Sequence, residues 1–167
     1  MSIDKCTGLQ FALPGYEFSL GTMIRALDTI RAGELDRAYI FGIPGHHAHR
    51  DWGHGYCLLN PLAAAAVYAT EIGFRTVLML DWDFHHGDGT QEVLAGLPNV
   101  HCIGVHAADY GSEHANWTND DFATLTNLVL DLAETNKAPV LSVHGGGYNR
   151  AVTVSAAEQH VRTLLAR

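Results

Sequence analysis

The chain has 167 residues, of which 47% are hydrophobic and 17% charged, and its formal net charge is −8 with neutral histidines. This length and composition fit one globular domain with a buried core and exclude a disordered chain. Only 10 Lys and Arg residues stand against 18 Asp and Glu, which argues against a protein that binds nucleic acid through its phosphates.

No membrane segment or leader is expected. The longest apolar run, LLNPLAAAAVYA, is too short and too interrupted to span a bilayer, and the N-terminal stretch lacks the basic start and apolar core of a signal peptide. The three cysteines are widely spaced and form no CxxC pair. We therefore expect a cytoplasmic protein with reduced thiols, in which Cys57 and Cys102 are small core residues.

Helix and strand patterns alternate along the chain. The first helix is expected at 16–35, and the second, at 60–73, begins with a favourable N-cap at Asn60 and Pro61 in its first turn. Strands are expected at 37–44, 75–83, 100–106 and 138–147, and further helices at 88–96, 118–136 and 151–166. This order predicts a single α/β domain over residues 1–167, with three layers: a mostly parallel sheet and helices on both of its faces.

Segments rich in histidine, aspartate and glycine lie where the predicted strands end. The four segments are PGHHAHRDWGHGYC, DWDFHHGDG, VHAADYG and VHGGGYN. The carboxyl ends of parallel strands meet at one edge of a sheet, which is where such folds bind their ligands. The sequence therefore predicts one site at this edge.

The stretch DWDFHHGDGTQ directly follows the buried strand. Side chains alternate along an extended chain, so Asp81, Asp83 and His85 are expected on one side. Carboxylate and imidazole are both zinc ligands, so Asp83 and His85 could hold one cation. The alternative is an acidic strand end followed by a turn, but the dense HHGDGTQ tail favours the metal.

Adjacent His46 and His47 could form a general acid–base pair, because imidazole titrates near neutral pH. Such a histidine needs a carboxylate to fix its tautomer, and Asp81 and Asp88 are the candidates. The alternative is a solvated histidine-rich loop.

Three glycines precede Tyr148 at the last strand end. They let the backbone approach a ligand closely, and a hydroxyl held there could donate to an oxyanion. The alternative is a simple β-to-α turn. His49 and His54 are expected to be surface residues without a role.

The three stretches PGHHAHRDWGHGYCLLNPLAAAA, VLMLDWDFHHGDGTQEVL and PVLSVHGGGYN closely resemble the zinc-dependent histone deacetylase family, which includes acetylpolyamine amidohydrolases. The resemblance runs from about residue 15 to the C-terminus and keeps the family's order of motifs. It implies an arginase-like α/β fold and hydrolysis of acetyl-amides on lysine side chains or polyamines.

The resemblance also implies a role for each matched position. Zinc would be held by Asp83 and His85. His47 would be the general base and His46 an electrostatic support, with Asp88 and Asp81 behind them. Tyr148 would polarise the acetyl carbonyl, and Gly55 would line the substrate channel. A structural K⁺ or Na⁺ would be held by Asp81, Asp83, His85, Gly104 and Val105.

One part of the family pattern is missing. The third zinc ligand of the family lies in an SAGFDAH-like segment that this sequence does not contain, and HAADYGSEH offers Asp109 as a replacement. The sequence leaves two alternatives: a shortened hydrolase, or a catalytically inactive module that binds acyl-amines or serves as structure. The intact His pair, carboxylates and Tyr148 favour the hydrolase. Missing central strands would leave open sheet edges, so we expect a homo-oligomer in which a partner chain covers the gap.

Overall fold

The structure is a computed structural model, and it describes residues 9–106, 117–147 and 149–167. The helices are η1 (Leu9–Ala12, a 3₁₀ turn), α1 (Leu13–Arg31), α2 (Pro61–Glu71), α3 (Asp88–Leu94), α4 (Asn119–Asn136) and α5 (Arg150–Leu165). The strands are β1 (Arg37–Ile40), β2 (Val77–Asp81), β3 (Val100–Gly104) and β4 (Val140–Val143). The predicted order of helices and strands is confirmed.

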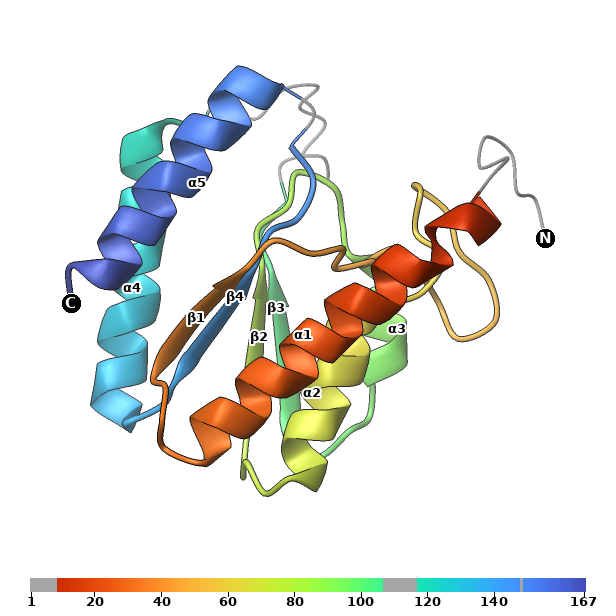
Figure 1. Cartoon of the computed structure of the whole chain (residues 1–167), viewed down its shortest axis with the longest axis horizontal. Coiled ribbons are helices and arrows are strands. Elements are labelled where there is room, and N and C mark those ends of the chain that lie inside the picture. The colour runs from red at the N-terminus through yellow and green to blue at the C-terminus, as the bar shows by residue number, and fades with distance from the viewer. Residues whose placement is uncertain (1–8, 107–116, 148) are drawn as a thin grey trace.

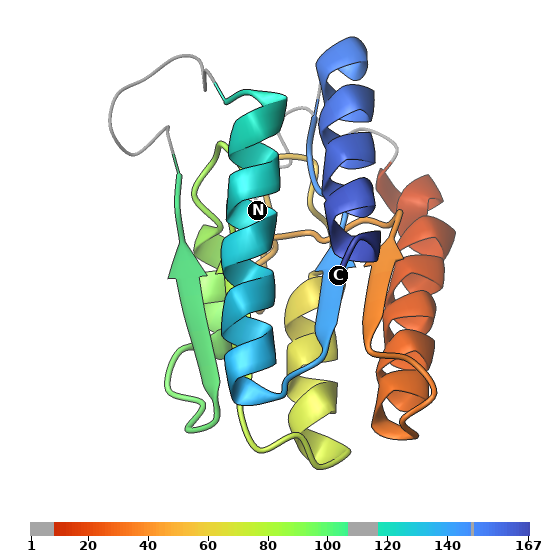
Figure 2. The ribbon, with the colours of Figure 1, turned by 90° about the vertical axis from the view of Figure 1, so that its left-hand side faces the viewer.

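The elements form three layers (Figure 1). Helices α1, α2 and α3 lie on one side of the strands, and α4 and α5 lie on the other. All four strands run in the same direction, so their carboxyl ends reach the same edge (Figure 2). The α/β class with helices on both faces is therefore confirmed.

The strands do not form the single sheet that the alternating pattern suggested. β1 pairs with β4 in parallel, with Ile40 opposite Val143, and β2 pairs with β3, with Asp81 opposite Gly104. Among the described strands, no ladder of hydrogen bonds joins β4 to β2. Periodicity does not show which strands become neighbours, but the missing central strands inferred from the sequence had predicted open sheet edges of this kind.

A cavity of about 990 Å³ occupies the break between the two strand pairs. Its walls include β2 and β4, and also helices from both outer layers, with Leu27 and Ala65 on one side and Thr126 and Ala156 on the other. An unbroken sheet would separate these two helical layers. The space between β2 and β4 is thus open through the middle layer.

Local capping explains where several helices begin. The Asn60 side chain accepts a hydrogen bond from the Ala63 N–H, as its sequence position predicted. Thr118 and Asp121 form a reciprocal capping box at the start of α4. Gly73, just beyond α2, has φ +100°, a conformation that favours glycine and allows the chain to turn into β2.

Two apolar clusters hold α1 and α2 onto the strands. The first consists of Met23, Leu27, Ile40, Ala65 and Ala69. The second consists of Ala63, Ala66, Met79, Leu94 and Val100. The small alanine side chains of α2 contribute to both clusters, which lets this helix bridge β1 and the β2–β3 pair.

The expectation that both cysteines are core residues is wrong. Cys57 is half-buried, and Cys102 is exposed on β3. β3 is an edge strand whose outer side chains are largely uncovered, so its apolar sequence overstates its burial. Within the described part of the chain, no helix has the length and apolarity needed to cross a membrane.

His160 joins three elements on the other face. Its Nδ1 lies 2.6 Å from Thr126 Oγ1 on α4, and its Nε2 lies 2.8 Å from Ser142 Oγ on β4. The Thr126 hydroxyl donates to the Phe122 carbonyl, so it accepts from His160 Nδ1–H, and the Ser142 hydroxyl can donate to Nε2. This arrangement suits the neutral imidazole, and burial lowers the His160 pKa below 6.5.

We predict that His160 makes the free energy of unfolding depend on pH. Its pKa is lower in the folded state, so the unfolded chain binds more protons as the pH falls through 6.5, and stability decreases in that range. Through His160, the free energy of unfolding should fall by at most about 1.4 kcal/mol for each unit by which the pH falls within this range. Urea unfolding between about pH 8 and pH 5 measures it.

His160→Gln, which keeps a polar side chain but does not titrate, should flatten the curve in this range. His101→Gln on β3 is the matched control, because His101 is exposed and lies on an edge strand. Identical pH slopes for the wild type and His160→Gln would contradict the assignment.

Candidate active site

The loop after β1 places His46 against the end of β2. His46 is 9% exposed, and its Nδ1 lies 2.9 Å from Asp81 Oδ2. The other Asp81 oxygen accepts a hydrogen bond from the Asp83 N–H at 3.0 Å. Burial opposes the charged form of His46, but the hydrogen bond to Asp81 and the nearby carboxylates outweigh it and raise the His46 pKa. His46 therefore stays protonated to a higher pH than an unperturbed imidazole.

His47 pairs with a different carboxylate. Its Nδ1 lies 2.8 Å from Asp88 Oδ1, and Asp88 is the first residue of α3. Burial lowers the His47 pKa, and the charges of His46 and His54 add to this, while the bond to Asp88 acts against it. The two adjacent histidines thus have pKa values shifted in opposite directions, which is the arrangement expected of an acid–base pair with separate roles.

Asp83 and His85 come together in the loop that follows β2. Asp83 Oδ1 lies 3.4 Å from His85 Nδ1, and it also accepts the His85 backbone N–H at 2.9 Å. Two ligand atoms on one tetrahedral zinc ion are about 3.3 Å apart at normal bond lengths. His46 Nε2 lies 3.9 Å from the same Asp83 oxygen. The spacing of Asp83 and His85 therefore fits a shared metal ion.

Neighbouring strand ends hold Asp83 in place. His106, a buried residue just after β3, donates from Nδ1 to the Asp83 carbonyl at 2.8 Å. Gly146, just after β4, has φ +63°, and a Cβ there would lie 2.4 Å from Asp83 Oδ2. The sequence pattern placed both stretches at this edge but assigned no role to His106. The position of His106 directly after a predicted strand was the sequence signal that could have identified it.

The residues expected around a monovalent cation lie side by side. Asp81 is opposite Gly104 in the register of β2 and β3, and the Val105 N–H donates to the Asp81 carbonyl at 2.8 Å. Asp83 and His85 follow in the adjoining loop. Whether an ion binds there stays a prediction.

Gly55 lies directly against the His47 ring. It has φ +53°, and a Cβ at this position would lie 2.4 Å from His47 Cδ2. Only glycine permits this close approach, which agrees with a role in lining the cavity beside the histidines. Tyr148 and Asp109, the expected carbonyl donor and the replacement ligand, lie outside the described residues.

Two histidines that were expected to be surface residues without a role lie at the site. His54 Nε2 is 2.8 Å and His49 Nε2 is 3.2 Å from Asp88 Oδ2. The His49 side chain is only 8% exposed, so for this residue the surface expectation is wrong. Partial burial of Asp88 opposes its ionisation, but hydrogen bonds from the three histidines lower its pKa far below the usual value. The close spacing of His47, His49 and His54 in one loop was the available signal.

We predict that Gly87→Ala disrupts the His46–Asp81 pair. Gly87 has an ordinary backbone angle, φ −80°, but an added Cβ would lie 2.4 Å from Asp81 Oδ2 and 3.2 Å from His46 Nδ1. Overpacking of this kind costs about 1–3 kcal/mol of stability. Because Asp81 would be displaced, the pKa of His46 measured by NMR on metal-free protein should fall.

Gly21→Ala is the matched control. Gly21 lies within α1 with no atom within 4 Å of an added Cβ, so the change should stabilise the helix by about 0.5–1 kcal/mol and leave the His46 pKa unchanged. An unchanged His46 pKa in Gly87→Ala would show that Asp81 does not control it.

The geometry can be set beside that of known proteins. Residues 6–114 match the family model described as the histone deacetylase domain. The chain is 35% identical over 107 residues to "Histone deacetylase 5" of Arabidopsis thaliana, a match that covers 61% of this chain and 16% of that protein. It is 39% identical over 87 residues to "Probable deacetylase" of Archaeoglobus fulgidus, covering 52% of this chain and 24% of that protein.

Among solved structures, the fold is similar to the crystal structure of the HDA15 HD domain. The TM-score is 0.78 with 20% sequence identity, and the match covers 92% of this chain and 64% of the other. This likeness supports the arginase/deacetylase type of α/β fold. The matched segments span a quarter or less of the two curated relatives named above.

Proposed function

The chain belongs to the histone deacetylase family, and from this premise we propose that it is a zinc-dependent amidohydrolase that removes acetyl groups from lysine side chains or polyamines. One observation carries the proposal. Two histidine–carboxylate pairs, with pKa values shifted in opposite directions, lie beside an Asp–His pair spaced for one metal ion.

Asp83 and His85 would hold the zinc ion, and Asp109 is the proposed third ligand. When bound, zinc polarises the acetyl carbonyl and makes water a better nucleophile. A structural K⁺ or Na⁺ beside Asp81 is part of the same proposal. The close contact of Gly146 with the Asp83 carboxylate supports a metal-binding role, because a side chain at that position would fill the space next to the ligand.

His47 is the proposed general base. Its Nδ1–H is directed at Asp88, which leaves Nε2 as the basic nitrogen that accepts a proton from the attacking water. The lowered His47 pKa keeps this nitrogen unprotonated at neutral pH. The same nitrogen then returns the proton to the departing amine.

His46 and Tyr148 would stabilise the transition state. The raised pKa of His46 extends the pH range in which it is charged, and in that form it would offset negative charge that develops on the substrate oxygen. Tyr148 would donate its hydroxyl hydrogen to the same oxygen. Gly55 would line the passage for the substrate chain.

A second candidate is an inactive module that binds acyl-amines. One observation favours it: within the described ranges, Asp83 and His85 belong to no group of three converging ligands. A catalytic zinc site normally has three protein ligands, so two alone would bind zinc poorly. The two candidates differ in whether the chain retains zinc.

Substrate and location complete the proposal. The net charge of −8 suits the cationic amine that deacetylation releases, whether a lysine side chain or a polyamine. A nucleic acid or membrane partner is not expected. A cytoplasmic location agrees with cysteines that form no CxxC pair.

The proposal is tested by zinc retention and hydrolysis together. Protein loaded with one equivalent of zinc is passed through a desalting column, and the retained zinc and the hydrolysis of an acetyl-lysine peptide and an acetylated polyamine are measured. Asp83→Ala and His85→Ala should retain less zinc than the wild type on the column and lose hydrolysis, whereas His47→Ala should keep zinc at Asp83 and His85 and lose about 100- to 10,000-fold in kcat. Asp109→Ala should lose zinc if that residue completes the site.

His101→Gln is the matched control, since it removes an exposed imidazole on β3, and it should keep both zinc and activity. Wild-type protein that retains no zinc and shows no turnover with zinc added would overturn the hydrolase assignment. Binding of the acetyl-lysine peptide without turnover would then identify the inactive module.

The proposal includes a homo-oligomer in which a second copy of this chain covers the break between β2 and β4. Among the described residues, both strands present an edge without a ladder partner, and the space between them is open to a large cavity. Unpaired edges and apolar surface are normally covered in native proteins. Ile103 and Val105, each 50% exposed near the carboxyl end of β3, add to the uncovered apolar surface.

We predict that light scattering coupled to size exclusion gives at least a dimer at micromolar concentration. Leu78→Lys should shift the equilibrium toward monomer, because Leu78 is a 41% exposed apolar residue on β2 that lines the cavity. Gln91→Lys, on the exposed side of α3, is the control and should leave the mass unchanged. A wild-type protein that is monomeric across the concentration range would contradict this part of the proposal.

A further inference from the structure

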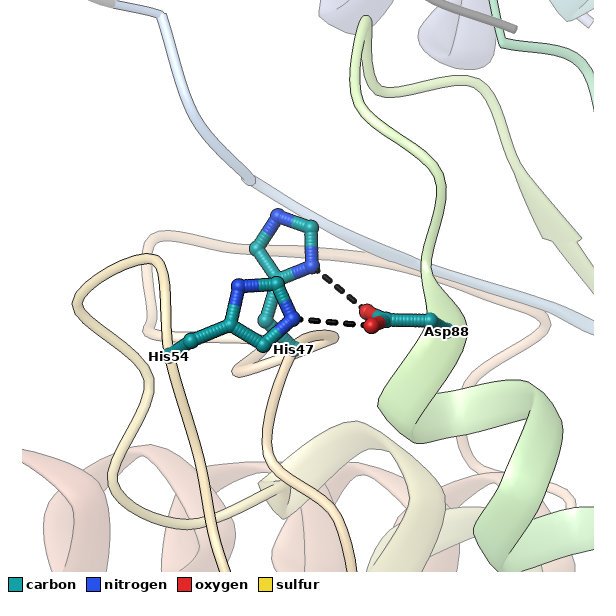
Figure 3. Close-up of side chains that lie close together, drawn as sticks. All are labelled: His47, His54 and Asp88. Carbon is teal, nitrogen blue, oxygen red and sulfur yellow. Dashed lines mark hydrogen bonds and ion pairs between the residues drawn. The ribbon is translucent and has the colours of Figure 1, made fainter. Parts of the chain in front are cut away.

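Three imidazole rings contact Asp88, whereas a catalytic histidine–carboxylate pair needs only one. Its Oδ1 lies 2.8 Å from His47 Nδ1, and its Oδ2 lies 2.8 Å from His54 Nε2 and 3.2 Å from His49 Nε2. Figure 3 shows His47 and His54 each presenting a ring nitrogen to the carboxylate. The general-base function accounts for the His47 contact alone. The contacts made by His54 and His49 are left without a function.

The arrangement of His47, His54 and Asp88 fits a divalent ion. Each offers one ligand atom, and these atoms all lie within 4.8 Å of one another. Within the described residues this is the one group of three or more such side chains that converges in this way. Imidazole nitrogen and carboxylate oxygen are preferred ligands of zinc and similar transition metals. A cation there would replace the protons that now lie between the rings and the carboxylate.

The surroundings make this group accessible and partly rigid. The His54 side chain is 42% exposed, which gives an ion a route from solvent. Trp52 stacks on His49 with ring centroids 3.8 Å apart and on His54 at 5.5 Å. The stacking supports the loop so that its histidines face Asp88, which lies at the start of α3.

We propose that His47, His54 and Asp88 bind a second divalent transition-metal ion of the zinc type, separate from the ion proposed for Asp83 and His85. The two sites share no ligand. The second site would use Nδ1 of His47, the nitrogen that is directed at Asp88, and the ring centroids of His47 and His85 are 6.0 Å apart. Binding of the metal stands independently of the hydrolase assignment.

One consequence rests on the proposed function. An ion on His47 Nδ1 takes the position of that nitrogen's proton, and the neutral ring then carries its proton on Nε2, so Nε2 cannot accept a proton from water. Occupancy of the second site should therefore inhibit hydrolysis. The pair of sites would let a metal ion activate the enzyme at low concentration and inhibit it at higher concentration.

The experiment titrates metal-free protein with Co²⁺ and with Zn²⁺, following visible absorption for cobalt and equilibrium dialysis for zinc. Wild-type protein should bind two equivalents. His54→Gln keeps a donor for Asp88 but lacks the imidazole ligand, so its second equivalent should bind about 100-fold more weakly or worse. His101→Gln, the control, should still bind two. His54 is exposed, so its replacement should leave the protein folded, which circular dichroism checks.

The Asp83→Ala variant distinguishes the second metal site from the zinc site proposed under the function. If both are correct, Asp83→Ala binds one equivalent, and the double variant with His54→Gln binds none. If only the second site exists, Asp83→Ala binds as much metal as the wild type and His54→Gln still loses an equivalent. Equal binding of the second equivalent by the wild type and His54→Gln would overturn the proposal, whatever the result at Asp83.

Discussion

The hydrogen bonds between the loop after β1 and the end of β2 are the contacts on which the site depends. No strand ladder connects the β1–β4 pair to the β2–β3 pair among the described residues. Hydrogen bonds join them at the site, from His46 to Asp81 and from His47 to Asp88, and the Thr90 N–H adds a bond to the His46 carbonyl at 3.0 Å. The apolar clusters of α2 also connect the two pairs, but these hydrogen bonds fix the geometry of the candidate site as well as the junction.

The burial of the two histidine–carboxylate pairs determines the electrostatics of the site. The carboxylates that fix the two imidazoles are themselves partly buried, so each hydrogen bond acts in an environment where it is poorly screened. His46 lies near two carboxylates, Asp81 and Asp83, whereas His47 lies near the cationic form of His46 and beside His54. Neighbouring residues in the sequence thus acquire opposite pKa shifts from different surroundings.

Much of the architecture and of the site follows from the sequence, and the parts that do not have physical reasons. The caps at Asn60 and Thr118 are local signals, so helix starts near them are predictable. The pairing of strands depends on contacts far apart in the chain, so the missing segment indicated open sheet edges but not that they would lie between β2 and β4. The positions of His49 and His54 depend on how one loop folds over Asp88, which neither periodicity nor capping determines.

The proposed hydrolase activity depends on a metal ion held by Asp83 and His85. Crystals of protein loaded with one equivalent of zinc, measured on both sides of the zinc absorption edge, test it most directly. We expect an anomalous peak bonded to Asp83 and His85, with His47 nearby but not coordinated. A crystal in which the single equivalent of zinc lies elsewhere, or in which Asp83 and His85 bind no zinc, would contradict it.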